Sequence, residues 1–317
     1  METQLLQLKK ITDVVADTGD IQSIIKYKPS DATTNPSLIL KSTQLDAYKP
    51  FINEAVQYAS GATDTIEQKM KLACDYLAVK IGKEILNHIP GLISTEVDAR
   101  LSYDTNETIK KAETLISLYE QLGVNKSRVL IKIASTWEGI QAAKILEQKG
   151  IHCNLTLLFS MAQAKAAADA GVYLISPFVG RIYDWYINKN KTEYVGSDDP
   201  GVKSVKEIFS YYKKYNVKTI VMGASFRNTS QILELAGCDK LTISPQLLEQ
   251  LSESHNLISK KLNNVIEANQ KVPNITQQQF LWEHNSDLMA VEKLAEGILL
   301  FARDQEKLEQ MIKQSYL

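Results

Sequence analysis

The chain has 317 residues, 44% of them hydrophobic and 23% charged, which is typical of a globular protein with a large core. Its 36 basic and 37 acidic side chains leave a formal charge of −1, which argues against nucleic acid or an anionic membrane as a partner. The three cysteines form no CxxC pair, and no apolar stretch approaches the about 20 residues that cross a bilayer. We therefore expect a soluble cytoplasmic protein.

Apolar runs alternate with segments of helical periodicity along most of the chain. We expect strands, with the polar turns that end them, at 11–20, 31–38, 92–100, 129–135, 152–159, 172–180, 219–226 and 240–245. Helices are expected at 2–10, 43–60, 65–87, 105–122, 136–149, 161–170, from Arg181 onward, at 202–215 and at 228–236. Ser160 is expected to cap helix 161–170 and Gly171 to end it.

Eight mostly apolar strands alternating with helices predict a parallel sheet covered by helices. Eight is also the number of strands that closes a (β/α)8 TIM barrel. The remaining residues, about 246–317, are expected to be helical and to pack on the outside of the barrel, including a long amphipathic segment at 286–314. No linker or low-complexity tract divides the chain, so we expect residues 1–317 to form one domain.

A lysine lies near the middle of the strand expected at 129–135, where the other residues suit a buried strand. Lysine is rarely buried unless it is paired, because removing its charge from water is costly. Burial favours the neutral amine, and a neutral amine attacks a carbonyl carbon to form a Schiff base. The alternative is that Lys132 only pairs with a buried carboxylate for stability.

Polar residues lie in or just past the C-terminal halves of different expected strands: Asp17, Asn35, Glu96, Lys132, Asn154, Thr156, Ser176 and Ser225. In a barrel these strand ends converge on one mouth, where such enzymes hold their active sites. Strand alternation turns Ile131 and Ile133 outward to the helices, so that Lys132 points to the barrel axis. These residues together supply a nucleophile, proton-transfer groups and hydrogen-bonding groups for a polyol.

Each of these residues has an ordinary structural explanation when it is taken alone. Asp17 could cap a helix, and Asn35 before Pro36 could begin a turn. Thr156 and Ser176 could be satisfied core hydroxyls. Glu96 could be only the counter-ion that permits a lysine in the interior.

Two of the five arginines, Arg181 and Arg227, follow the expected sixth and seventh strands. A guanidinium near a helix N-terminus suits a phosphate group, although a surface pair with a carboxylate would also explain each position. The histidines show no metal-ligand spacing, and the chain has neither a P-loop nor a GxGxxG motif after a strand. We expect no metal and no cofactor.

Six motifs along nearly the whole chain resemble those of the transaldolase family: Asp17-Thr18-Gly19-Asp20, Asp31-Ala32-Thr33-Thr34-Asn35-Pro36-Ser37, Ser94-Thr95-Glu96-Val97-Asp98, Leu130-Ile131-Lys132-Ile133-Ala134, Cys153-Asn154-Leu155-Thr156-Leu157 and Gly223-Ala224-Ser225-Phe226-Arg227-Asn228. The resemblance implies a homodimeric or monomeric (β/α)8 enzyme of the pentose phosphate pathway. It would move a dihydroxyacetone unit from sedoheptulose 7-phosphate to glyceraldehyde 3-phosphate. The products would be erythrose 4-phosphate and fructose 6-phosphate.

The resemblance also implies a role for each matching residue. Lys132 would be the Schiff-base nucleophile, Glu96 would shuttle protons with a water held by Thr156, and Asp17 would trigger carbon–carbon cleavage. The substrate-binding set would be Thr33, Asn35, Asn154, Ser176, Phe178, Arg181, Ser225 and Arg227, the last three of which would hold the phosphate.

Two other activities remain alternatives. One is a Schiff-base aldolase, of the kind that acts on fructose 6-phosphate, which releases free dihydroxyacetone. Phe178 bears on this choice, because a ring without a hydroxyl offers no ordered proton source to the enamine, although ordinary strand packing also explains it. The other alternative is a sugar-phosphate-binding barrel without catalytic activity. In each case the expected partners are small sugar phosphates and, for transaldolase, a second copy of the chain.

Overall fold

The computed structural model describes residues 2–263 and 272–316. Eight parallel strands pair in chain order, and β1 pairs with β8 to close a barrel. The strands are β1 (Asp13–Asp17), β2 (Asp31–Thr33), β3 (Ile93–Glu96), β4 (Val129–Ala134), β5 (Cys153–Leu158), β6 (Leu174–Pro177), β7 (Ile220–Gly223) and β8 (Lys240–Ile243). The predicted (β/α)8 TIM barrel is confirmed.

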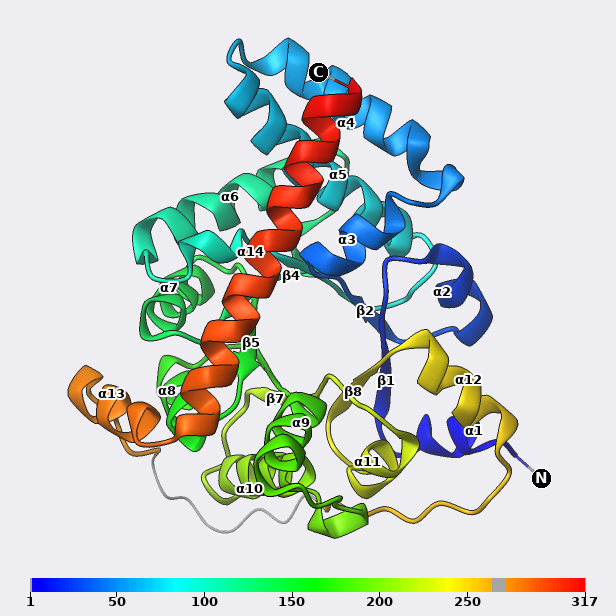
Figure 1. Ribbon diagram of the computed structural model, residues 1–317, viewed down its shortest axis with the longest axis vertical. Helices are drawn as coiled ribbons and strands as arrows, with labels where there is room; N and C mark the ends of the chain where they lie inside the picture. The colour runs from blue at the N-terminus through cyan, green and yellow to red at the C-terminus, as the bar shows by residue number, and fades with distance from the viewer. Residues whose placement is uncertain (1, 264–271, 317) are drawn as a thin grey trace.

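Helices surround this barrel (Figure 1). The α-helices are α1 (Gln4–Leu8), α2 (Ile21–Tyr27), α3 (Pro36–Ser42), α4 (Lys49–Ala62), α5 (Ile66–Leu86), α6 (Thr105–Gln121), α7 (Trp137–Gln148), α8 (Met161–Ala170), α9 (Val179–Asn190), α10 (Pro200–Lys214), α11 (Thr229–Glu234), α12 (Pro245–Glu253), α13 (Gln277–Asn285) and α14 (Leu288–Tyr316). Short 3₁₀ turns are η1 (Asp46–Tyr48), η2 (Ala99–Leu101), η3 (Lys126–Arg128) and η4 (Gly196–Asp198).

Residues in the turns between strands and helices stabilise the first turn of several of these helices. Asp20 accepts hydrogen bonds from the first amides of α2, and Pro36 occupies the first turn of α3, where it needs no amide donor. Ser160 forms a reciprocal capping box with Gln163 at α8, and Gly171 ends that helix with a φ of 66°. The expected cap and stop of α8 are therefore confirmed.

The barrel interior changes from apolar to polar along its axis. Four inward side chains form an apolar cluster: Val15, Leu130, Leu174 and Met222. Because side chains of a strand alternate between its two faces, the next inward positions of β1, β4 and β6 are Asp17, Lys132 and Ser176. Ile131 and Ile133 belong to the core between strands and helices, as expected. The apolar cluster thus forms the floor beneath the polar mouth.

Helix α14 differs from its expected position. Instead of packing only on the outside, it crosses the face of the barrel (Figure 1). Its inward residues Leu294, Ile298 and Phe301 pack with Leu157 and Phe178 from the strand ends. The sequence shows the amphipathic pattern of this helix but not the surface on which it lies.

The bounds of several other predicted helices were wrong. The helix expected from residue 43 begins only at Lys49, after η1, and α9 begins two residues before Arg181. The expected helical remainder is interrupted, because residues 254–263 and 272–276 contain no helix, while residues 264–271 lie outside the described part. Within residues 2–263 and 272–316, no helix combines the length and apolar character needed to span a membrane.

Candidate active site

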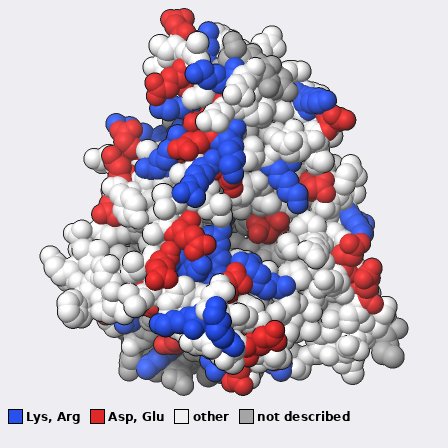
Figure 2. All heavy atoms as spheres, viewed as in Figure 1, with Lys and Arg blue, Asp and Glu red and all other residues white. Residues whose placement is uncertain are grey.

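A pocket of about 70 Å³ opens among the C-terminal ends of the strands. Figure 2 shows the surface hollowed near the middle of this face, with basic and acidic side chains around the hollow. The pocket is lined by Asp17, Thr33, Asn35, Lys132, Ser176, Phe178, Arg181, Ala224, Ser225, Thr242 and Phe301. A larger hollow of about 670 Å³ lies near α8 and α10. Three of its four lysines, Lys165, Lys213 and Lys261, are ion-paired with carboxylates.

Lys132 lies at the base of this pocket and is only 4% exposed. It is directly paired in register with Glu96 of β3, and its Nζ lies 3.2 Å from Glu96 Oε2. The same Nζ lies 3.4 Å from the carbonyl oxygen of Thr34. Burial raises the pKa of the Glu96 carboxyl, and the positive charge of Lys132 opposes that rise. The pair therefore joins a potential nucleophile to a carboxylate that can accept a proton.

A second buried carboxylate, Asp17, ends β1 at the same mouth. Its Oδ1 accepts a hydrogen bond of 2.9 Å from Thr33 Oγ1, which also lies 2.9 Å from Thr242 Oγ1. Burial raises the pKa of Asp17, and Lys132, the Thr33 hydroxyl and Arg181 all oppose this effect. Asp17 is thus held in a fixed orientation and is easier to protonate than an exposed aspartate.

Amide and hydroxyl groups complete the inner wall. Asn154 Nδ2 donates to Ser94 Oγ over 3.1 Å, and its Oδ1 accepts a hydrogen bond from Ser176. Two buried polar atoms in the described part have no hydrogen-bond partner: Thr156 Oγ1, and Glu96 Oε2, whose contact with Lys132 Nζ is the 3.2 Å ion pair. Since buried polar atoms are nearly always satisfied by protein or water, these two atoms fit a site that binds a water or a substrate group.

The guanidinium of Arg181 lies at the mouth between two aromatic rings. Its Cζ lies 5.0 Å from the ring centre of Phe178 and 5.4 Å from that of Phe301. Burial lowers the pKa of Arg181, and the nearby Arg227 adds to this effect. A guanidinium that lies over two aromatic rings and lines a pocket can use its N–H groups to bind an anion.

Arg227 is placed at the rim by the turn after β7. It forms an ion pair with Asp184, with Nε and Nη2 at 3.0 and 2.7 Å from Oδ2, while its Nη1 lies 3.4 Å from Ser225 Oγ. Ser225 has a φ of 61°, a conformation that non-glycine residues rarely adopt. At Gly180, a Cβ atom would lie 2.2 Å from the Ser225 carbonyl oxygen, so this contact requires glycine.

Asn35 serves two purposes. Its side chain caps α3 by accepting a 2.9 Å hydrogen bond from the amide of Leu38, and it also lines the pocket. Asn35 therefore has a structural role as a helix cap rather than as the start of a turn, and this role does not exclude contact with a ligand.

The structure brings most of the predicted site residues together. Eight of them line the pocket, Glu96 and Asn154 contact residues that do, and Thr156 lies buried beside them in β5. Arg227 is at the rim and engaged with Asp184. Sequence reasoning missed Thr242 and Phe301. The inward position of Thr242 on β8 could have identified it, whereas Phe301 comes from α14, whose position no local pattern reveals.

Comparisons with known proteins show the family of the chain. The model of the family "Transaldolase/Fructose-6-phosphate aldolase" matches residues 14–312. A transaldolase of Haemophilus influenzae (strain PittEE) is 60% identical over 313 residues, which cover 98% of this chain and 99% of that protein. A transaldolase of Histophilus somni (strain 129Pt) is 59% identical over 317 residues and covers both chains fully. The chain therefore belongs to the transaldolase/fructose-6-phosphate aldolase family.

Proposed function

We propose that this protein is a transaldolase. It transfers a dihydroxyacetone unit from sedoheptulose 7-phosphate to glyceraldehyde 3-phosphate, giving erythrose 4-phosphate and fructose 6-phosphate. The observation that carries the proposal is the buried Lys132–Glu96 pair at a barrel mouth that it shares with Asp17. This arrangement provides a nucleophile and two separate carboxyl groups for proton transfer.

Formation of the Schiff base uses the Lys132–Glu96 ion pair and the nearby hydroxyl of Thr156. Glu96 accepts a proton from the amine, and Lys132 Nζ attacks the keto carbon of the donor. Glu96 then returns a proton to the carbinolamine oxygen, through a water held by Thr156, and that oxygen leaves as water. The ion pair of Glu96 Oε2 with Lys132 Nζ and the absence of a hydrogen-bond partner for Thr156 Oγ1 among the described residues support this proton path.

Cleavage uses Asp17. Its carboxylate takes the proton of the donor hydroxyl two carbons from the iminium carbon, the carbon–carbon bond breaks, and the bonding electrons move into the iminium to form an enamine. The aldose phosphate leaves, and Asn35, Asn154 and Ser176 hold the three-carbon enamine. The enamine carbon then attacks the acceptor aldehyde, Asp17 returns the proton, and hydrolysis of the new Schiff base frees the product.

We expect the phosphate to bind at the mouth of the pocket. Arg181 supplies a desolvated cation, and Arg227 and Ser225 extend the site toward the rim. Thr33 acts indirectly, by orienting Asp17.

Borohydride trapping tests the proposal. The protein is incubated with fructose 6-phosphate, reduced, digested and mapped by mass, and transfer to erythrose 4-phosphate is measured on the same preparation. We expect a dihydroxyacetone adduct on Lys132 and acceptor-dependent transfer. Lys132→Ala should lose both, and an adduct that survives in this variant would contradict the assignment.

The proposal also covers the location, the partners and the oligomeric state of the enzyme. We propose that the enzyme acts in the cytoplasm as a homodimer, with small sugar phosphates and neither nucleic acid nor membrane as partners. Large apolar side chains on α13 and α14 remain exposed, including Trp282 at 78%, Leu288 at 61% and Leu299 at 56%, as expected of a subunit interface. Light scattering coupled to size exclusion measures the mass in solution, and a monomer would contradict the dimer.

A further inference from the structure

Helix α14 buries one stripe of side chains, against the barrel mouth in its first half and against α4 and α5 near its C-terminal end. The stripe is mostly apolar and includes Leu294, Ile298, Phe301, Leu308 and Ile312. Two carboxylates interrupt it, because Asp304 is 8% exposed and Glu309 is 5% exposed. All of these residues fall on one face at 3.6 residues per turn. Buried carboxylates are costly unless they are paired, so their partners explain why they lie on this stripe.

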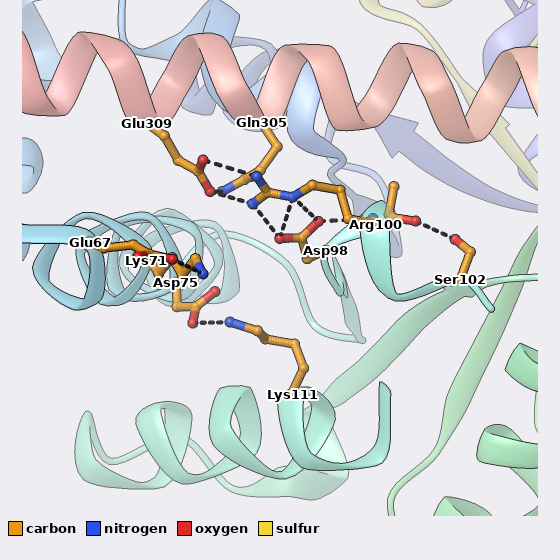
Figure 3. A network of polar contacts seen from close by, with 10 residues as sticks. Glu67, Lys71, Asp75, Asp98, Arg100, Ser102, Lys111, Gln305 and Glu309 are labelled. Carbon is orange, nitrogen blue, oxygen red and sulfur yellow. Dashed lines mark hydrogen bonds and ion pairs between the residues drawn. The ribbon is translucent and has the colours of Figure 1, made fainter. Parts of the chain in front are cut away.

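The partner of Glu309 is Arg100, in the turn that follows β3 (Figure 3). Arg100 Nη1 donates to Glu309 Oε2 over 3.1 Å, and its Nη2 contacts both Glu309 Oε1 and Asp98 Oδ2. Asp98 also accepts from Arg100 Nε over 2.9 Å, and Gln305 donates to Glu309 over 3.3 Å. The guanidinium thus bridges α14 to Asp98, which lies two residues after Glu96.

Asp304 forms a second polar contact of α14, with α3. Its Oδ2 accepts a hydrogen bond from Ser37, which lies in the first turn of α3, two residues after Asn35. Its Oδ1 lies 2.9 Å from Lys307 Nζ. We call these two contacts, Glu309–Arg100–Asp98 and Asp304–Ser37, the α14 clamp.

The residue held by this clamp is Phe301, one turn before Asp304. Its side chain is 2% exposed, and its ring centre lies 6.0 Å from Lys132 Nζ. The helix approaches the mouth so closely at Gly297 that a Cβ atom there would lie 2.6 Å from Leu157 and 2.9 Å from Arg181. A purely apolar stripe would leave the register of α14 weakly defined, whereas two paired carboxylates define it.

We propose that Arg100, Glu309 and Asp304 are positioning residues, which hold Phe301 over the mouth and so keep water from the enamine. The inference rests on the proposed transaldolase function and deepens it. When water reaches the site, the enamine carbon takes a proton from it and becomes the iminium of dihydroxyacetone. The hydroxide left by this water adds to the iminium carbon, the hydroxyl proton moves to the nitrogen, the carbon–nitrogen bond breaks, and the products are free dihydroxyacetone and the unmodified lysine.

The test measures the partition between release and transfer. Fructose 6-phosphate serves as the donor, free dihydroxyacetone is measured without acceptor, and transfer is measured with erythrose 4-phosphate. The clamp variants are Glu309→Gln and Arg100→Lys, the milder change that keeps the charge but cannot bridge two carboxylates. The control is Asp31→Asn, which weakens a buried ion pair with Lys240 (2.8 Å) at the opposite end of the barrel and keeps the acceptor of the Leu92 amide.

We expect both clamp variants to raise release relative to transfer and to lower kcat/KM for transfer by up to about 100-fold, the cost of misplacing a group by 1 Å. The double variant should show the same ratio of release to transfer and the same kcat/KM as the stronger single variant, because both substitutions act through one contact. Amide hydrogen exchange of α14 should quicken in each clamp variant. Asp31→Asn should lower the melting temperature without changing the partition.

Folded clamp variants that keep the wild-type partition and the wild-type exchange of α14 would overturn the inference, as would an equal change in Asp31→Asn. These outcomes differ from a failure of the proposed function. In that case the wild-type protein itself would form no adduct on Lys132 and would show no transfer.

Discussion

Glu96 and Lys132 are direct partners across β3 and β4, and their Oε2 and Nζ atoms lie 3.2 Å apart inside the barrel. The register of two neighbouring strands therefore brings a carboxylate and an amine together without any loop. Strand register is rigid because both faces of these strands are buried.

Glu96→Gln removes the proton acceptor and keeps the shape of the side chain. We expect Schiff-base formation to slow by about 10²–10⁴-fold, the range for loss of a general acid–base group. Rapid mixing followed by borohydride quenching measures this rate. If the adduct forms at the wild-type rate, Glu96 is only the counter-ion of Lys132.

Asp17→Asn separates Schiff-base formation from cleavage. We expect an adduct that contains the whole six-carbon donor rather than the three-carbon fragment, because no carboxylate removes the hydroxyl proton. Mass spectrometry after borohydride reduction distinguishes the two adducts. A three-carbon adduct that forms at the wild-type rate would exclude Asp17 as the base.

The same substitution should increase the free energy of unfolding at neutral pH. Burial raises the pKa of Asp17, so the folded state disfavours its ionised form, and a neutral isostere removes that cost. The wild-type protein should regain part of the difference as the pH falls through the raised pKa toward the unfolded value of 3.8. Urea unfolding of both proteins at several pH values measures this trend, and a less stable Asp17→Asn protein would contradict it.

Phe178→Tyr places a hydroxyl beside the enamine. Because that hydroxyl can order or donate a proton, we expect more free dihydroxyacetone to be released from fructose 6-phosphate. A coupled assay for dihydroxyacetone without acceptor measures the gain. Unchanged release would mean that the ring contributes only packing against Arg181 and Phe159.

Gly180→Ala should weaken binding of the phosphate. The new Cβ would lie 2.2 Å from the Ser225 carbonyl oxygen and 2.8 Å from Arg227 Cγ, so the turn that carries both residues must shift. We expect a higher KM for phosphorylated donors, with a smaller effect on kcat. Gly61→Ala is the matched control, since a Cβ there meets no atom within 4 Å. An unchanged KM would show that this turn does not contact the phosphate.

His284 should make stability depend on pH. Burial lowers its pKa from 6.5, and Asp287 opposes this effect. Below pH 6.5 the unfolded chain therefore binds a proton that the folded state resists, and stability falls as the pH decreases. Between about pH 7.5 and 5.5 the wild-type protein should lose more unfolding free energy than His284→Gln. Equal losses would contradict the prediction.

Local sequence patterns were sufficient to predict which strand residues point toward the barrel interior. Alternation placed Lys132 inward and Ile131 and Ile133 outward, because barrel strands have only two faces. The position of Phe301 could not be predicted, since an amphipathic helix reveals its apolar face but not the surface that covers it. The carboxylate that pairs with Arg227 could not be predicted either. Asp184 lies on α9, and the spacing of residues in the sequence does not specify the angle of that helix.

Helix α14 follows all eight strands in the chain, which has a consequence for synthesis. On the ribosome the strands emerge first, so a nascent barrel already carries its lysine and both carboxylates but still lacks Phe301. If such a chain bound a ketose, its intermediate would meet bulk solvent. If Phe301 excludes water as proposed, productive turnover requires that α14 has left the exit tunnel and docked.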